Sequence, residues 1–243
     1  MTKARTYPRR GLHGAVVHDI GVRILRGDLE PGDPIPTEEE LGSDLGADVA
    51  VSRTVVREAV KVLAAKRLVE SRPKIGTRVR PRREWNLLDP DVLAWTVEAG
   101  PDDHFLEQAL EVRGLIEPHV VRLAAERATD EQIAQLEQAH RDLEQAGESL
   151  EAFMEPDLRF HTLLFETTHN ELLEQMASIL TSMLRAIFAY SGRPGAFGRS
   201  ARRHGAIVKA IRKHDPDAAE AALLKLIGDT RATVEWARKQ GPG

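Results

Sequence analysis

The sequence predicts a mostly α-helical protein with a small N-terminal head and a larger, all-α body. Three observations support this fold class. Apolar residues recur at helical spacing along most of the 243 residues. Two short β-like runs lie before residue 80, and no strand alternation follows residue 84. The length is enough for one large domain or two smaller ones, each with its own core.

Composition narrows the class of protein. The chain has no cysteine, which excludes disulfides, thiol chemistry and cysteine-zinc sites. It is 42% hydrophobic and 30% charged, as soluble globular proteins usually are. The opening MTKARTYPRRG is basic but leads into no apolar segment, and no apolar run approaches the roughly 18–20 residues of a membrane span. We therefore expect a cytoplasmic protein with no membrane partner.

The head begins with three predicted helices. Apolar residues over 13–26 lie on one helical face. Thr37 and Glu40 have the spacing of a capping box, which predicts a short second helix. A turn at 46–48 follows, and Ser52 is placed to cap a third helix.

A hairpin is predicted to complete the head. Its two short runs, 68–71 and 77–79, are joined by a turn that contains Pro73 and Gly76. Helix, short helix, turn, helix and hairpin is the order of elements in a winged helix-turn-helix. We assign residues 1–80 to this domain.

Charge is distributed unevenly along the chain. Residues 1–84 carry a formal charge of +5, whereas residues 85–243 carry −9. Within residues 52–83, 11 basic residues face only Glu58 and Glu70. A basic head on an acidic body suggests that the head binds nucleic acid. An unevenly charged surface with no such role is the plainer alternative.

The third helix carries the residue types that read DNA. Ser52, Arg53, Thr54 and Arg57 lie in its first turns, on the side that its apolar residues leave free. Recognition helices meet base edges with their N-terminal residues, and arginine can bind guanine through two hydrogen bonds. Lys74, at the hairpin tip, would follow the phosphate backbone or the minor groove. A charged helix followed by an ordinary hairpin is the alternative.

The rest of the chain is predicted as helices. Residues 81–102 are expected to form a linker with a short helix, and residues 103–240 an all-α bundle of six or seven helices. The main helical patterns cover 104–127, 130–146, 150–168, 171–191, 199–214 and 215 to about 239.

Four polar residues fall on the apolar faces of these helices: Arg113, Asp157, His161 and His204. Buried charges need partners or a metal. Asp157 and His161 are four residues apart and can hold one ion between them, and His204 could supply a third ligand. One oxygen and two nitrogens suit Zn²⁺, Ni²⁺ or Mn²⁺ better than Ca²⁺ or Mg²⁺.

Arg113 would then attract an anion, most naturally a carboxylate that also contacts the metal. Two plainer alternatives remain open. Asp157 and His161 could form one buried hydrogen bond, and Arg113 could simply pair with Glu117.

Three segments of the head resemble the GntR family of bacterial transcription regulators: PGDPIPTEEEL, VSRTVVREAVKVLAAKRLVE and GTRVRP. The resemblance implies a homodimer on a palindromic operator. It also implies that Arg53, Thr54 and Arg57 contact the operator, with Ser52 and Gly76 beside them.

The head departs from the family pattern at three places. Glu39 stands where many relatives have arginine, which removes one expected DNA contact. The turn between Leu45 and Val51 is longer than usual, and Arg67 and Lys74 replace common glycines.

The body resembles the FCD ligand-binding domain of the FadR subfamily. The likeness lies in EVRGLIEPHVVRLAAERAT, DLRFHTLLFETTHN and RRHGAIVKAIRKHDPDAAEAAL. It implies that Asp157, His161 and His204 hold a divalent metal and that Arg113 binds an effector acid. The family's last histidine falls at Leu226 and is absent, so we expect the metal to be weakly held.

A finer likeness, in WNLLDPDVLAW, AERAT, HN and the leucine at 226, is to family members that control sugar-acid catabolism. It implies a repressor controlled by an aldonate such as D-galactonate. Asn170, Ser178, Ser182 and Ser200 are candidates to bind the hydroxyl groups of such an acid. The alternatives are a metal-dependent hydrolase or lyase acting on a small acid, and a DNA-packaging protein without sequence preference.

Overall fold

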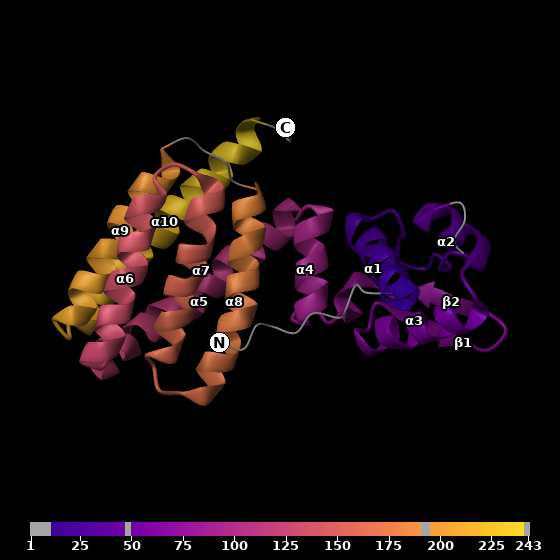
Figure 1. The fold of residues 1–243 in the computed structure, drawn as a ribbon, viewed down its shortest axis with the longest axis horizontal. Helices are drawn as coiled ribbons and strands as arrows, with labels where there is room; N and C mark the ends of the chain where they lie inside the picture. The colour runs from indigo at the N-terminus through magenta and orange to yellow at the C-terminus, as the bar shows by residue number, and fades with distance from the viewer. Residues whose placement is uncertain (1–10, 47–49, 191–194, 241–243) are drawn as a thin grey trace. The chain divides into compact units, whose positions relative to one another are not determined.

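The computed structural model describes residues 11–46, 50–190 and 195–240. Within these ranges the chain forms ten α-helices, a short 3₁₀ turn and one two-stranded sheet. The chain divides into two compact units, Met1–Gly100 and Pro101–Gly243. This confirms the predicted fold class, a winged helix-turn-helix head with an all-α body (Figure 1).

The N-terminal unit has the predicted order of elements. Its sheet is an antiparallel hairpin in which Val69 pairs with Val79 and Arg72 pairs with Gly76. The elements are α1 (Gly11–Arg26), α2 (Glu38–Leu45), α3 (Arg53–Ala65), β1 (Val69–Arg72), β2 (Gly76–Val79), the 3₁₀ turn Arg82–Glu84 and α4 (Pro90–Ala99). The turn predicted at 46–48 lies largely outside the described residues.

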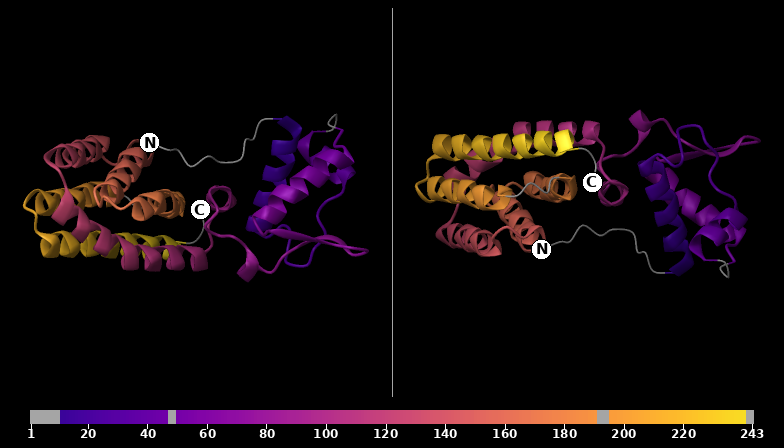
Figure 2. Two further views of the ribbon diagram at one scale, coloured as in Figure 1. Left: turned by 90° about the horizontal axis from the view of Figure 1, so that it is seen from below. Right: turned by 90° about the horizontal axis from the view of Figure 1, so that it is seen from above.

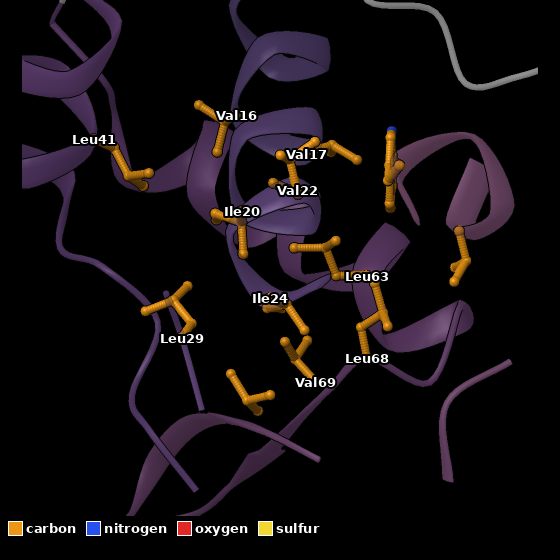
Figure 3. Close-up of a cluster of buried hydrophobic side chains, with 14 of the residues drawn as sticks. Val16, Val17, Ile20, Val22, Ile24, Leu29, Leu41, Leu63, Leu68 and Val69 are labelled. Carbon is orange, nitrogen blue, oxygen red and sulfur yellow. The ribbon is translucent and has the colours of Figure 1, made fainter. Parts of the chain in front are cut away.

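Local capping sets the starts of the short helices. Thr37 and Glu40 form the capping box before α2, each satisfying an amide of the other's residue. The Ser52 side chain accepts a hydrogen bond from the amide of Val55 at the start of α3. Behind these helices lies an aliphatic core to which α1, α2, α3 and β1 contribute (Figure 3). Its members include Val16, Val17, Ile20, Ile24, Leu41, Leu63, Leu68 and Val69.

The short helix α4 belongs to the head rather than to a free linker. It packs on α1, where Gly21 leaves room for the Trp95 ring: a Cβ at Gly21 would lie 2.5 Å from a ring carbon. Lys66, at the end of α3, is 8% exposed and forms ion pairs with Asp89, at 2.8 Å, and with Asp91. The predicted linker at 81–102 thus holds a helix docked on the head, and the unit ends at Gly100.

The C-terminal unit is a bundle of six helices among the described residues. Helix α10 packs along both α5 and α9, and α7 packs against α6 and α8 (Figure 2). The helices are α5 (Asp103–Arg127), α6 (Asp130–Ala146), α7 (Leu150–Glu166), α8 (Glu171–Tyr190), α9 (Ala196–Arg212) and α10 (Pro216–Gln240). Helix α9 begins three residues earlier than predicted, after Gly195, whose φ is 75°.

Helix α8 is the one described helix that is long and apolar enough to cross a membrane by length and composition alone. It has 20 residues, a mean hydropathy of 1.2 over its most apolar window, and 33% of that window buried. Core helices of bundles pass the same test, and α8 packs against α7 and α5. The helix also carries Glu174 and Arg185 within its length.

Candidate functional site

The bundle brings together the three residues predicted to ligate a metal. Asp157 and His161 lie on α7, and His204 lies on α9. These residues are 2%, 1% and 0% exposed. One potential ligand atom from each lies within 4.8 Å of the other two. The i, i+4 spacing on α7 places its two residues on one buried face, and α9 supplies the third from across the core.

His204 is oriented by its own helix. Its Nδ1 lies 2.8 Å from the backbone carbonyl oxygen of Ser200. A carbonyl can only accept a hydrogen bond, so Nδ1 carries a proton and donates it. In the neutral ring, Nε2 then presents a lone pair 3.2 Å from Asp157 Oδ1. Two acceptors at this distance require a proton or a cation between them.

Four buried polar atoms around the cluster have no hydrogen-bond partner among the described residues: Arg113 Nη1, Asp157 Oδ2, His161 Nδ1 and His204 Nε2. Buried polar atoms that lack a hydrogen bond cost roughly 1–3 kcal/mol each. A divalent transition metal between α7 and α9 would satisfy Asp157 Oδ2 and His204 Nε2, whereas His161 Nδ1 faces Glu117. The residues present therefore fit a metal ion with three protein ligands.

Arg113 pairs with Glu117, the plainer of the two expectations for this arginine. Arg113 Nε donates to Glu117 Oε1 at 2.7 Å, and Nη2 donates to Oε2 at 3.2 Å. Both side chains are 1% exposed. Glu117 Oε2 also lies 3.3 Å from His161 Nδ1, within ion-pair range but outside hydrogen-bond geometry. Glu117 was not predicted as a site residue, although its place four residues after a buried arginine was the available signal.

The electrostatics keep both carboxyl groups of the site ionised. Burial raises the pKa of Glu117, but Arg113 and His161 outweigh burial and hold this pKa well below its ordinary value. Burial likewise raises the pKa of Asp157, and the interactions with His204, His161 and Arg113 lower it further than burial raises it. The site therefore has two buried negative charges against one buried arginine.

A pocket opens beside the cluster, lined by side chains of α5, α7, α8, α9 and α10. Its polar lining includes Arg113 and Ser200, as predicted, together with four residues that were not predicted. These four are Arg199, Asp229, Thr230 and Thr233. Leu184, Ile187, Phe188 and Phe197 form its apolar wall, and Leu226 also faces it.

The structure does not bring Asn170, Ser178 and Ser182 to this pocket. The Asn170 side chain caps α8 by accepting from the amides of Leu172 and Leu173. The hydroxyls of Ser178 and Ser182 donate to backbone carbonyls of their own helix, at 3.2 and 2.8 Å. None of these three residues lines the pocket, whereas Ser200 does.

The candidate DNA-binding residues lie on the outside of the head. Arg53 and Arg57, in the first two turns of α3, have side chains 94% and 73% exposed. Their ion pairs with Glu38 and Glu58 are long, at 3.7 Å. Such exposed pairs hold a side chain weakly, which leaves both arginines available to a ligand.

The hairpin tip and the end of α3 contain unusual backbone conformations. Lys74 and Gly76 have φ values of 67° and 89°, and Arg67 has a φ of 60°. Residues other than glycine adopt this left-handed backbone conformation only at an energetic cost. Arg67 and Lys74 are the two positions at which the resemblance expects glycine, so the chain keeps the backbone shape without the usual residue.

Comparison with known proteins identifies the class. Residues 12–79 match the family described as bacterial regulatory proteins, gntR family, and residues 108–229 match the FCD domain. The chain belongs to the GntR family of DNA-binding transcription regulators, with an FCD domain as its body.

Two curated relatives are repressors. The galactonate operon transcriptional repressor of Escherichia coli (strain K12) is 38% identical over 217 residues, which cover 88% of this chain and 93% of the relative. The HTH-type transcriptional repressor NanR of Escherichia coli is 31% identical over 242 residues, covering 95% and 87%. These relatives are transcription regulators and not enzymes, which contradicts the hydrolase alternative.

Solved structures agree on the fold. The structure titled "Lar controls the expression of the Listeria monocytogenes agr system and mediates virulence" has a TM-score of 0.62 at 16% identity, covering 94% of this chain and 99% of its own. Streptococcus agalactiae GntR has a TM-score of 0.50 at 26% identity, covering 91% and 99%.

Proposed function

We propose that this regulator is a homodimeric cytoplasmic repressor of sugar-acid catabolism genes, released from or recruited to its operator by a small carboxylate such as D-galactonate. The acid binds in the pocket of the FCD domain beside a divalent transition metal, Zn²⁺, Ni²⁺ or Mn²⁺. One observation carries this proposal: a buried arginine and a buried cluster of three potential metal ligands line the same pocket. The relationship to the galactonate operon repressor supports an aldonate as the acid.

The charges of the pocket support an order of binding. With neutral histidines, the carboxylates of Asp157 and Glu117 exceed the charge of Arg113 by one, and the charges of Arg199 and Asp229 on the lining cancel, which favours a cation. A divalent ion changes the net charge from −1 to +1, which then favours a monoanion. The acid is therefore expected to bind tightly only after the metal.

The proposed contacts follow from the lining. The carboxylate of the acid meets Arg113 Nη1, which is buried and makes no hydrogen bond to a described residue. The hydroxyl groups meet Ser200, Thr230 and Thr233, and Arg199 lies on the same lining. The apolar wall of the pocket excludes water from the carboxylate and strengthens its interaction with the arginine.

The head supports the DNA-binding half of the proposal. Ser52, Arg53, Thr54, Arg57, Lys74 and Gly76 contact the operator. A two-fold dimer matches a palindromic operator, one head on each half-site. The acid acts by binding more tightly to one state of the dimer than to the other.

A thermal-shift experiment tests the proposal. D-Galactonate should raise the unfolding midpoint of the Ni²⁺-loaded wild-type protein, since a ligand that binds only the folded state stabilises it by about 2.7 kcal/mol at one hundred times Kd. A chelator and Arg113→Ala should each abolish the shift. Arg141→Ala, which removes an exposed arginine from α6, serves as the control. A shift that persists in Arg113→Ala would contradict the pocket, and other aldonates would identify the acid if galactonate gives none.

A further inference from the structure

Glu117 contacts both Arg113, the proposed acid-binding residue, and His161, one of the three potential metal ligands. One of its oxygens accepts from Arg113 Nε, and the other accepts from Arg113 Nη2 and lies 3.3 Å from His161 Nδ1. The carboxylate is 1% exposed and is not part of the pocket lining. It therefore contacts neither the metal nor the acid directly, yet it contacts one residue of each binding group.

The carboxylate biases the position of the proton on His161. A carboxylate only accepts hydrogen bonds, so Glu117 favours the tautomer with the proton on Nδ1. The other nitrogen, Nε2, then presents its lone pair toward Asp157 Oδ2, 3.8 Å away. A small rotation of the ring would turn the Nδ1 contact into a hydrogen bond.

His204 is held in the same tautomer by a different acceptor, the backbone carbonyl of Ser200. Both rings then direct an unprotonated Nε2 at the same carboxylate, Asp157. Metal-binding histidines usually donate their second nitrogen to a carboxylate or a carbonyl, which fixes the ring and raises its basicity. The two histidines of this cluster use one acceptor of each kind.

The same carboxylate also orients Arg113. Glu117 takes two of the guanidinium nitrogens, Nε and Nη2, and leaves Nη1 without a hydrogen bond among the described residues. A planar guanidinium held at two nitrogens has little freedom to rotate. Arg113 lines the pocket, so Glu117 fixes the orientation of its guanidinium there and leaves Nη1 available to a ligand.

We propose that Glu117 is a positioning residue that sets the tautomer of His161 and the orientation of Arg113, and so couples metal affinity to acid affinity. This inference rests on the proposed function of the pocket. Loss of the Glu117 carboxylate weakens the binding of both the metal and the acid, although neither of them contacts it.

Glu117→Gln tests the coupling with little change in shape. The glutamine oxygen is expected to keep the shorter contact, with Arg113 Nε at 2.7 Å, so the amide group takes the Oε2 position. There it no longer accepts from Arg113 Nη2, and it donates to His161 Nδ1. That arrangement moves the imidazole proton to Nε2, where it blocks the metal. Ni²⁺ affinity, measured by calorimetric titration, is expected to fall about 10–100-fold. D-Galactonate should bind this variant more weakly at saturating Ni²⁺.

Glu111→Gln is the matched control. Glu111 lies on the same helix but is exposed, so this change removes the same charge away from the pocket. Its Ni²⁺ affinity should equal that of the wild type. Equal affinity in Glu117→Gln and Glu111→Gln would overturn the proposal.

The tautomer of His161 can also be measured directly in the wild-type protein, so this test does not depend on whether a variant folds. Nitrogen-15 correlation spectra of the histidine rings in metal-free wild-type protein report which nitrogen of His161 carries the proton. A proton on Nδ1 supports the proposal, and a proton on Nε2 overturns it. If the wild type binds no Ni²⁺ at all, the proposed metal site is wrong, and these spectra still decide the role of Glu117.

Discussion

Leu226 is the residue at which the metal cluster departs from the FCD pattern. It lies on α10, is 2% exposed and lines the pocket beside the three potential ligands. A leucine offers no lone pair, so the cluster offers three potential protein ligands, and a metal held by them would keep positions open to water or an acid. This single position explains why we expect weak metal binding that depends on the acid.

Leu226→His is expected to tighten Ni²⁺ binding on the order of tenfold or more, because a fourth protein ligand completes the site. Calorimetric titration of the variant and the wild type measures this change. Leu224→His places the same residue on α10 at an exposed position and should leave the affinity unchanged. If the two variants bind Ni²⁺ equally, Leu226 does not face the ion. The tighter metal site should also respond less to the acid.

Arg57→Ala is expected to weaken operator binding by about 1–3 kcal/mol, roughly fivefold to more than a hundredfold, if this arginine binds a base edge. The Arg57 side chain is 73% exposed, so the change should leave the unfolding midpoint within a degree or so of the wild type. Fluorescence anisotropy at fixed salt measures the affinity. Arg141→Ala, on the body, should bind the operator normally. Equal loss on operator and unrelated DNA would indicate a phosphate contact instead.

At the scale of helices and strands, a feature could be predicted from the sequence where it depends on residues close together in the chain. The starts of α2 and α3 followed from Thr37 and Ser52, because a cap acts within three residues. The docking of α4 on α1 could not be predicted, because it depends on Gly21 fitting Trp95 across about seventy residues of chain.

The candidate site shows the same division. Asp157 and His204 stood out because a polar residue on an apolar stripe breaks a local pattern. Glu117 could be placed near Arg113 from its spacing, but its contact with His161 depends on how α5 packs against α7. Sequence spacing did not determine which side of α8 lines the pocket: Leu184, Ile187 and Phe188 do, and Ser178 and Ser182 do not.

Gly21→Ala is expected to destabilise the head by about 1–3 kcal/mol, because a Cβ there would lie 2.5 Å from the Trp95 ring and would force α4 away from α1. Urea unfolding followed by tryptophan fluorescence measures the change. Gly228→Ala, in the open interior of α10, is the control with the opposite sign. No atom outside its own helix backbone and chain neighbours lies within 4 Å of a Cβ built there, so it should stabilise the body by roughly 0.5–1 kcal/mol. A neutral effect of Gly21→Ala would show that α4 does not dock as described.

At the scale of the whole molecule, the two candidate sites lie in different units. The pocket is lined only by residues between Arg113 and Thr233, all within the unit Pro101–Gly243. The candidate DNA-binding residues all lie within Met1–Gly100. Residues 1–84 and 85–243 also carry opposite net charges, +5 and −9, so non-specific attraction to DNA belongs to the head.

A fragment of residues 101–243 is therefore expected to fold, to bind Ni²⁺ and D-galactonate with affinities close to those of the full chain, and to bind no DNA. Its six helices bury their own core, and no residue of the head lines the pocket described here. Circular dichroism would measure its helix content, thermal shifts its ligand binding, and anisotropy its binding to DNA. The full chain at the same concentration is the comparison.

If the fragment is helical but gives no shift with Ni²⁺ while the full chain does, the pocket depends on the head. If the full chain also gives none, the proposed metal site is wrong. Ligand binding in the fragment with no effect of ligand on DNA binding by the full chain would place the sensor correctly but contradict its control of the operator.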